Sequence, residues 1–174
     1  MKAKHVLFAC LSLVLCGCRS FTIPISPDAI ETDPRLYGLW SSQQGMFVDI
    51  RQDGNNRYKI MLNRGSDSET EFVALPAVIG GMHFLSLQVI KSKNPFLEPL
   101  KYCYAYLSYR FINERKLEFQ FVDSDTLPSN IVSPTGMRTE VRRRLESGCL
   151  FERKLFFLSK NGAGYQPVVG RSLT

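Results

Sequence analysis

Three tyrosines alternate along one segment of the chain and are its strongest candidates for recognition chemistry. Tyr102, Tyr104 and Tyr106 stand two residues apart, so on a β-strand their side chains share one face, about 7 Å apart. A tyrosine offers a flat apolar ring and a terminal hydroxyl, which suits an apolar ligand, a sugar or a protein partner. Together with Trp40 these residues form a candidate ligand or partner face. Ordinary packing is the alternative, because aromatic residues are common in half-buried strands.

Two carboxylates stand at a spacing that acid–base chemistry could use. Asp123 and Asp125 are two residues apart and could point the same way. A hydrolase would need a cleft that holds one of them about 5 to 10 Å from another acid. Acids beside a turn are usually solvated, and only shifted pKa values in a cleft would make them a catalytic pair. An envelope hydrolase is therefore kept as an alternative.

Other catalytic and cofactor patterns are missing from the sequence. His83 follows Gly80-Gly81 and shares a face with Leu85, as a histidine at the end of a strand would. There is no G-x-S-x-G elbow, H-E-x-x-H pair, phosphate loop or dinucleotide glycine pattern. We therefore predict no catalytic residue, no metal site and no cofactor, and we expect a protein that is not an enzyme.

The amino terminus has the zones of a secretory signal peptide. Lys2 and Lys4 form a short basic start, and residues 6–15 form an uncharged apolar run. Ten helical residues rise roughly 15 Å, about half of the hydrocarbon core of a bilayer, so the run is too short for a transmembrane anchor. We expect residues 1–17 to be a cleaved signal peptide, since a helix of the folded domain would need a polar face.

The apolar run ends in Leu15-Cys16-Gly17-Cys18, which resembles the lipobox of bacterial lipoproteins. The resemblance implies cleavage before Cys18 and attachment of fatty acyl chains, such as palmitate, to that cysteine. Several acyl chains, at about 0.8 kcal/mol per buried methylene, make a stable membrane anchor. Arg19, in place of an aspartate, implies an outer-membrane anchor that faces the periplasm. A cell-surface or inner-membrane anchor and an ordinary secreted protein are the alternatives.

The mature chain is mildly basic. Cleavage would leave 157 of the 174 residues, and the loss of two lysines would lower the formal net charge from +6 to +4. A nucleic-acid binder would need a basic face with stacking aromatics, so we predict no nucleic-acid partner. The predicted helix carries four arginines: Arg138, Arg142, Arg143 and Arg144. We expect them to lie on a plain solvated helix surface. The alternative is a patch that binds the phosphates of lipid headgroups or lipopolysaccharide.

Two cysteines, Cys103 and Cys149, remain after the signal peptide and Cys18 are set aside. In an oxidising compartment they are a candidate disulfide. A loop of about 45 residues closed in this way would contribute on the order of 3 to 4 kcal/mol in the chain-entropy model. Two separate buried thiols are the alternative, and no C-x-x-C pattern suggests a redox or zinc site.

The rest of the chain predicts one β domain. Residues 18–34 contain three prolines and are expected to form a lipidated tether, and residues 161–174 a flexible tail. Residues 35–160 alternate between apolar and polar positions between short turns, which is typical of an antiparallel meander. A helix is predicted from the Ser133 cap to Gly148, before a last strand over residues 149–158. The expected fold is mainly β, with seven to eight strands and one helix inserted before the last strand.

The unpaired edges of such a meander favour closure into a small barrel or a strongly curled sheet. Gly38-Leu39-Trp40, at the expected first strand, resembles the G-x-W opening of lipocalins and related calycins. The resemblance implies a tryptophan packed across the base of a barrel and a ligand held inside. That family also stacks a late arginine on the tryptophan, and Arg153 is the candidate by position. No second motif of the T-D-Y type follows.

The sequence thus predicts a lipid-anchored envelope lipoprotein that acts by non-covalent contact. The expected partners are the membrane, through lipid on Cys18, and an envelope protein or a small amphiphile. Besides the hydrolase, a protein-type enzyme inhibitor is an alternative, with residues 91–99 as its protruding loop.

Overall fold

The structure is a computed structural model that describes residues 21–26, 30–43, 45–63, 69–93 and 101–160. The predicted signal peptide, Cys18 and the predicted tail over residues 161–174 lie outside the described residues, as does most of the loop over residues 91–99. In the described part of the chain no helix is both long and apolar enough to span a bilayer.

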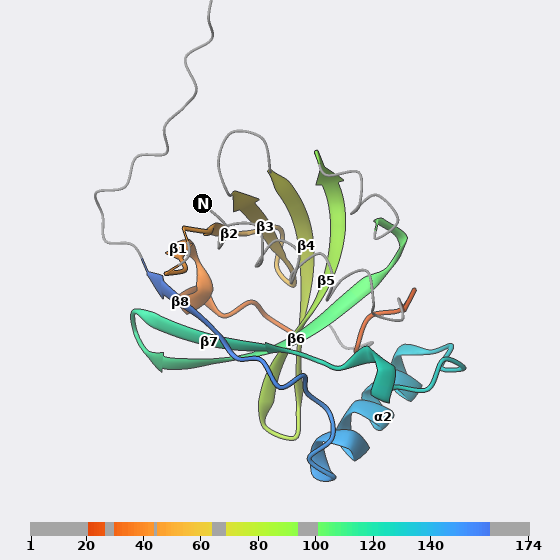
Figure 1. The fold of residues 1–174 in the computed structure, drawn as a ribbon. Helices are drawn as coiled ribbons and strands as arrows, with labels where there is room; N and C mark the ends of the chain where they lie inside the picture. Colours follow the sequence, from red (N-terminus) through yellow and green to blue (C-terminus); the bar gives the residue numbers. More distant parts are fainter. Residues whose placement is uncertain (1–20, 27–29, 44, 64–68, 94–100, 161–174) are drawn as a thin grey trace, which may run out of the picture.

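Eight antiparallel strands form a closed barrel in which each strand pairs with the next along the chain and β8 returns to pair with β1 (Figure 1). The 13-residue helix α2 (Pro134–Glu146) lies between the seventh and eighth strands. The predicted fold class is therefore confirmed. The strands are β1 (Gly38–Ser41), β2 (Phe47–Gln52), β3 (Tyr58–Asn63), β4 (Thr70–Ile79), β5 (Met82–Ser92), β6 (Tyr104–Asn113), β7 (Lys116–Phe121) and β8 (Phe156–Lys160).

Local chemistry explains the main boundaries. Gly80 and Gly81 both have positive φ, +59° and +79°, which a two-residue hairpin between β4 and β5 requires. The Ser133 hydroxyl accepts a hydrogen bond from the Gly136 amide and so caps α2. The last strand begins later than predicted, at Phe156. Before it, Leu150 is buried in the outer core and Phe151 forms an isolated bridge with Val122, just after β7.

The two ends of the barrel differ. The base is the end at which the short 3₁₀ helix η1 (Pro34–Leu36) precedes β1 and at which β8 ends beside Trp40. The mouth is the opposite end, where β5 ends and β6 begins.

Apolar residues gather in two separate clusters. The inner core fills the barrel and is formed by 16 buried residues: Leu36, Trp40, Met46, Val48, Ile50, Tyr58, Ile60, Phe72, Ala74, Leu85, Val89, Leu107, Tyr109, Leu117, Phe121 and Leu158. The outer core lies between the barrel wall and α2 and is formed by 11: Phe21, Ile25, Ala77, Ile79, Phe84, Tyr106, Val122, Leu127, Met137, Val141 and Leu150.

Residues 21–26, which the sequence assigns to the tether, pack on the barrel instead of standing off from it. This segment, the strap, pairs with the first residue of β6 through a bridge between Phe21 and Tyr104. Ile25 is fully buried in the outer core. The prolines of this segment predict a tether, but its apolar residues Phe21 and Ile25 cover the outside of β5 and β6.

Candidate functional site

The barrel interior holds a cavity of about 110 Å³. All the residues that line it are apolar except for the hydroxyl of Tyr109: Leu36, Met46, Val48, Ile50, Ile60, Leu62, Phe72, Leu85, Leu87, Ala105, Leu107, Tyr109, Leu117, Phe119, Phe121 and Leu158. For comparison, an apolar cavity of about 150 Å³ stays dry and binds benzene. The cavity can therefore take a small apolar group or a section of an acyl chain.

The space arises from the strand alternation together with one small side chain. Every second residue of β2, β3, β5 and β6 points inward, and most of these are large aliphatic residues. Ala105, paired with Leu87, contributes only a methyl group to the wall. On the next two strands, Phe119 of β7 stacks on Phe156 of β8 with 5.1 Å between ring centroids, which makes that part of the wall flat and aromatic.

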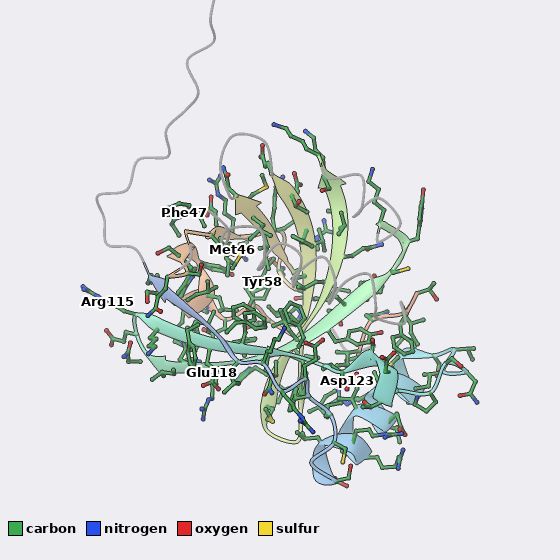
Figure 2. The ribbon with its side chains drawn as sticks, viewed as in Figure 1. Met46, Phe47, Tyr58, Arg115, Glu118 and Asp123 are labelled. Carbon is green, nitrogen blue, oxygen red and sulfur yellow. The ribbon has the colours of Figure 1, made fainter. Side chains whose placement is uncertain are left out.

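The cavity is lined differently toward its two ends. Leu62, Leu87 and Ala105 lie toward the mouth and are partly exposed. At the base Leu36 and Trp40 are buried almost completely. A ligand would therefore enter from the mouth. Figure 2 labels two residues of the inner core, Met46, just before β2, and Tyr58, on β3.

The base is closed by Trp40. Its indole N–H donates to the carbonyl of Leu36 at 2.8 Å, which ties β1 to η1. The ammonium of Lys160 lies 5.3 Å from the centroid of the indole and donates to the carbonyl of Arg35 at 3.2 Å. The prediction that Trp40 packs across the base agrees with this geometry, but Arg153 does not reach it. The cation is Lys160, at the end of β8, and Arg153 lies exposed before that strand.

Polar groups beside Trp40 reinforce the closure. The Asp33 amide donates to the Tyr58 hydroxyl at 2.5 Å, and Asp33 also caps η1. Burial raises the pKa of Tyr58 to about 12 and also raises the pKa of Tyr109. Both hydroxyls are therefore protonated at neutral pH. The guanidinium of Arg35, whose hydrogen bond lowers the pKa of Asp33, lies 4.5 Å from the Phe111 ring.

The three tyrosines do not form one exposed face. Tyr106 is 3% exposed, and its hydroxyl donates to the carbonyl of Ile23 at 2.5 Å. Phe21 stacks on it with 5.8 Å between centroids. Tyr104 is partly buried, and Tyr102 lies before β6 and is exposed. The strap thus occupies much of the surface that was predicted to bind a partner, and Trp40 is a base residue rather than part of that surface.

The candidate carboxylates lie away from the barrel interior. Asp123 accepts the amide of Asp125 at 3.1 Å as the cap of the 3₁₀ helix η3 (Ser124–Thr126), and Asp125 is exposed. Figure 2 shows Asp123 on the α2 side of the molecule, apart from Met46 and Tyr58. Burial, with the charge of Asp123, raises the pKa of Glu152. Within the described chain no three histidine, cysteine or acidic side chains gather as metal ligands.

The remaining predicted residues have separate surroundings. Cys103 is partly buried and Cys149 exposed, and the structure contains no disulfide between them. Disulfide formation in an oxidising compartment stays a prediction. His83 packs its ring 5.3 Å from that of Tyr109.

The helix arginines do not form one free basic patch. Arg143 and Arg144 both bond Glu140, at 2.5 and 2.8 Å. Arg138 reaches from α2 to the strap and donates to the Ser26 hydroxyl at 2.7 Å and to the carbonyl of Val78 at 3.2 Å. The prediction of a solvated helix surface is therefore wrong for Arg138, whose role is to hold α2 and the strap on β4.

Comparison of the chain with family models, with curated proteins and with solved structures finds no match. The cavity, its closed base and the strap therefore carry the functional interpretation.

Proposed function

We propose that this chain is a lipid-anchored envelope lipoprotein whose barrel is a lipocalin-like, non-enzymatic binding module for a small amphiphile. The observation that carries the proposal is the apolar cavity of about 110 Å³ between a tightly closed base and a partly exposed mouth. An apolar tail inside the barrel would replace contacts with water by contacts with leucine, methionine and phenylalanine side chains.

The lining also defines the chemistry of the ligand. No charged residue lines the cavity, and a buried charge without a partner would be costly. The ligand is therefore an unbranched or lightly branched hydrocarbon chain or a small ring, with its polar group left at the mouth. Leu62, Leu87 and Met46 can change rotamer and so enlarge the space for a chain.

The closed base supports the lipocalin-like interpretation. Trp40 at the base carries a cation on its indole, as the G-x-W resemblance implies, although the cation is a lysine. A hydrogen bond from the indole to Leu36 also joins it to η1. An interior that is closed at one end and apolar throughout favours an amphiphile over a protein partner, which would contact the outside of the barrel.

Filling the cavity tests this function. We expect Ala105→Leu and Ala105→Phe to weaken binding of the fluorescent fatty acid cis-parinaric acid, an amphiphile with an unbranched chain, in that order, by at least tenfold for the larger side chain. Each added side chain takes up space that the probe needs. The matched control, Ile112→Phe, changes an exposed residue of β6 near the base and should leave the affinity unchanged. Circular dichroism checks that all three variants fold. Equal affinities for the folded variants would refute the binding cavity.

The anchor is tested separately. Cys18→Ala should abolish incorporation of labelled palmitate and leave unprocessed or soluble protein, because the acylated thiol is lost. Mass spectrometry of the membrane fraction provides the measurement. Labelling that survives the substitution would rule out Cys18 as the lipid site.

A further inference from the structure

We infer that the strap fixes the orientation of the barrel on the bilayer, with the mouth resting against the lipid surface. The inference depends on the proposed lipid anchor and adds to it the geometry of attachment. It starts from the number of residues between the anchor and the folded domain. Cys18 precedes Phe21 by three residues, so their Cα atoms are at most about 11 Å apart even in a fully extended chain.

The strap is held on the barrel by contacts from several elements. The carbonyl of Phe21 accepts the Tyr104 amide at 2.7 Å, and the Ile25 amide donates to the Ser86 hydroxyl at 2.9 Å. The Tyr106 hydroxyl and the Arg138 guanidinium bond Ile23 and the Ser26 side chain. Phe21 and Ile25 are 5% and 0% exposed. Because peeling off the strap would expose both residues, it acts as part of the domain and not as a flexible linker.

The strap begins near the mouth. Phe21 lies opposite Tyr104, the first residue of β6. From there the strap runs away from the mouth, and its later residues bond Ser86 of β5 and Arg138 of α2. In Figure 1 the strap is the short red-to-orange segment near β6. The lipid on Cys18 is therefore attached within about 11 Å of the mouth-side end of the strap. The opposite end of β6, at Asn113, lies roughly 30 Å further along the strand.

The surface around this point suits a bilayer interface. Tyr102 is 77% exposed and Ile90 is 46% exposed, and both flank the β5–β6 connection at the mouth. Lys91 and Lys101 stand beside them in the sequence. An exposed tyrosine, an exposed aliphatic side chain and lysines together fit the headgroup region, where amphipathic rings insert and ammonium groups contact anionic lipid.

This orientation specifies the source of the amphiphile. A mouth against the bilayer lets an acyl chain pass from the membrane into the cavity without crossing water. The chain of a membrane lipid, rather than a solute of the surrounding compartment, is the ligand that this geometry favours.

The test places a tryptophan at either end of β6 in the full-length, lipidated protein. Tyr102→Trp and Ile112→Trp are each reconstituted in vesicles of phosphatidylethanolamine and phosphatidylglycerol with brominated acyl chains. We expect the Tyr102→Trp fluorescence to fall at least twofold relative to unbrominated vesicles, and the Ile112→Trp fluorescence to stay unchanged. Trp40, at the base, gives the baseline in the unsubstituted protein.

Two further measurements separate the possible causes. A spacer of 20 glycine and serine residues between Ser20 and Phe21 should remove the difference between the two tryptophans, since it lengthens the link but leaves the strap intact. Equal quenching at both positions, or a difference that the spacer leaves untouched, would overturn the inference. Mass spectrometry of the same samples reports the lipid on Cys18. Lipid-free protein would refute the proposed anchor, whereas lipidated protein with equal quenching would refute only the orientation.

Discussion

The inner and outer cores of this protein are both built mainly from apolar side chains but differ in what these side chains surround. The inner core surrounds a cavity, and its polar contacts lie at the base around Trp40 and Tyr58. The outer core joins three parts of the chain that are distant in sequence, through hydrogen bonds such as Tyr106 to Ile23 and Arg138 to Ser26. The barrel thus keeps free space at its centre, while the outer core holds the strap in place.

The largest expected effect compares the same substitution in both cores. Leu150→Ala in the outer core removes a fully buried side chain and should lower the free energy of unfolding by about 3 kcal/mol. Leu87→Ala, at the partly exposed wall of the cavity, should cost about 1 to 2 kcal/mol, since a side chain beside a void has fewer contacts to lose. Urea denaturation measures both. A larger loss for Leu87→Ala would mean that the inner core is filled in solution.

A smaller effect is expected at the base of the inner core and depends on pH. The pKa of Tyr58 is raised from 10.0 to about 12. The contribution of the protonated Tyr58 hydroxyl to the free energy of unfolding is complete below pH 10. It is lost between pH 10 and 12, because in this range the unfolded chain releases the proton that the folded chain retains. This loss amounts to roughly 2 to 3 kcal/mol for a shift of this size.

Tyr58→Phe should therefore flatten the alkaline part of the stability profile, although Tyr109 still contributes in the same direction. The variant should also be less stable at neutral pH by about 1 kcal/mol, since the Asp33 amide loses its acceptor. Tyr102→Phe, at an exposed position, is the matched control. Thermal denaturation from pH 7 to 12 provides the measurement, and an unchanged profile for Tyr58→Phe would contradict a buried, protonated hydroxyl.

The sequence predicted the inner core far better than the outer one. Period-two alternation, the paired glycines Gly80 and Gly81 and the Ser133 cap are local signals, and they were sufficient for the strands, the hairpin and α2. The strap was missed because its contacts, such as Ile25 to Ser86, join residues 61 positions apart. Nothing local distinguishes an apolar residue in a tether from one in a core.

The site shows the same division between local and long-range information. The three residues Gly38-Leu39-Trp40 were sufficient to predict Trp40 at the base. The cation that contacts the indole was predicted to be Arg153, but in the structure it is Lys160. Register across the closing pair of strands decides this choice: Trp40 lies opposite Lys160 in the ladder between β1 and β8. The cavity could not be predicted either, because its volume depends on how sixteen side chains pack, and Ala105 alone carries no signal of a void.

The smallest expected effect tests whether the base is a specific closure or only another surface contact. Lys160 and Lys116 each place an ammonium over an aromatic ring, at 5.3 Å from Trp40 and 5.1 Å from Phe157. Trp40 is fully buried and Phe157 is 42% exposed, so only the first ring is shielded from water. Lys160→Met should cost about 1 kcal/mol and Lys116→Met less than about 0.5 kcal/mol. Trp40 fluorescence should also shift only in the first variant, since its indole loses the cation. Equal costs in chemical denaturation would mean that Trp40 closes the base without help from the end of β8.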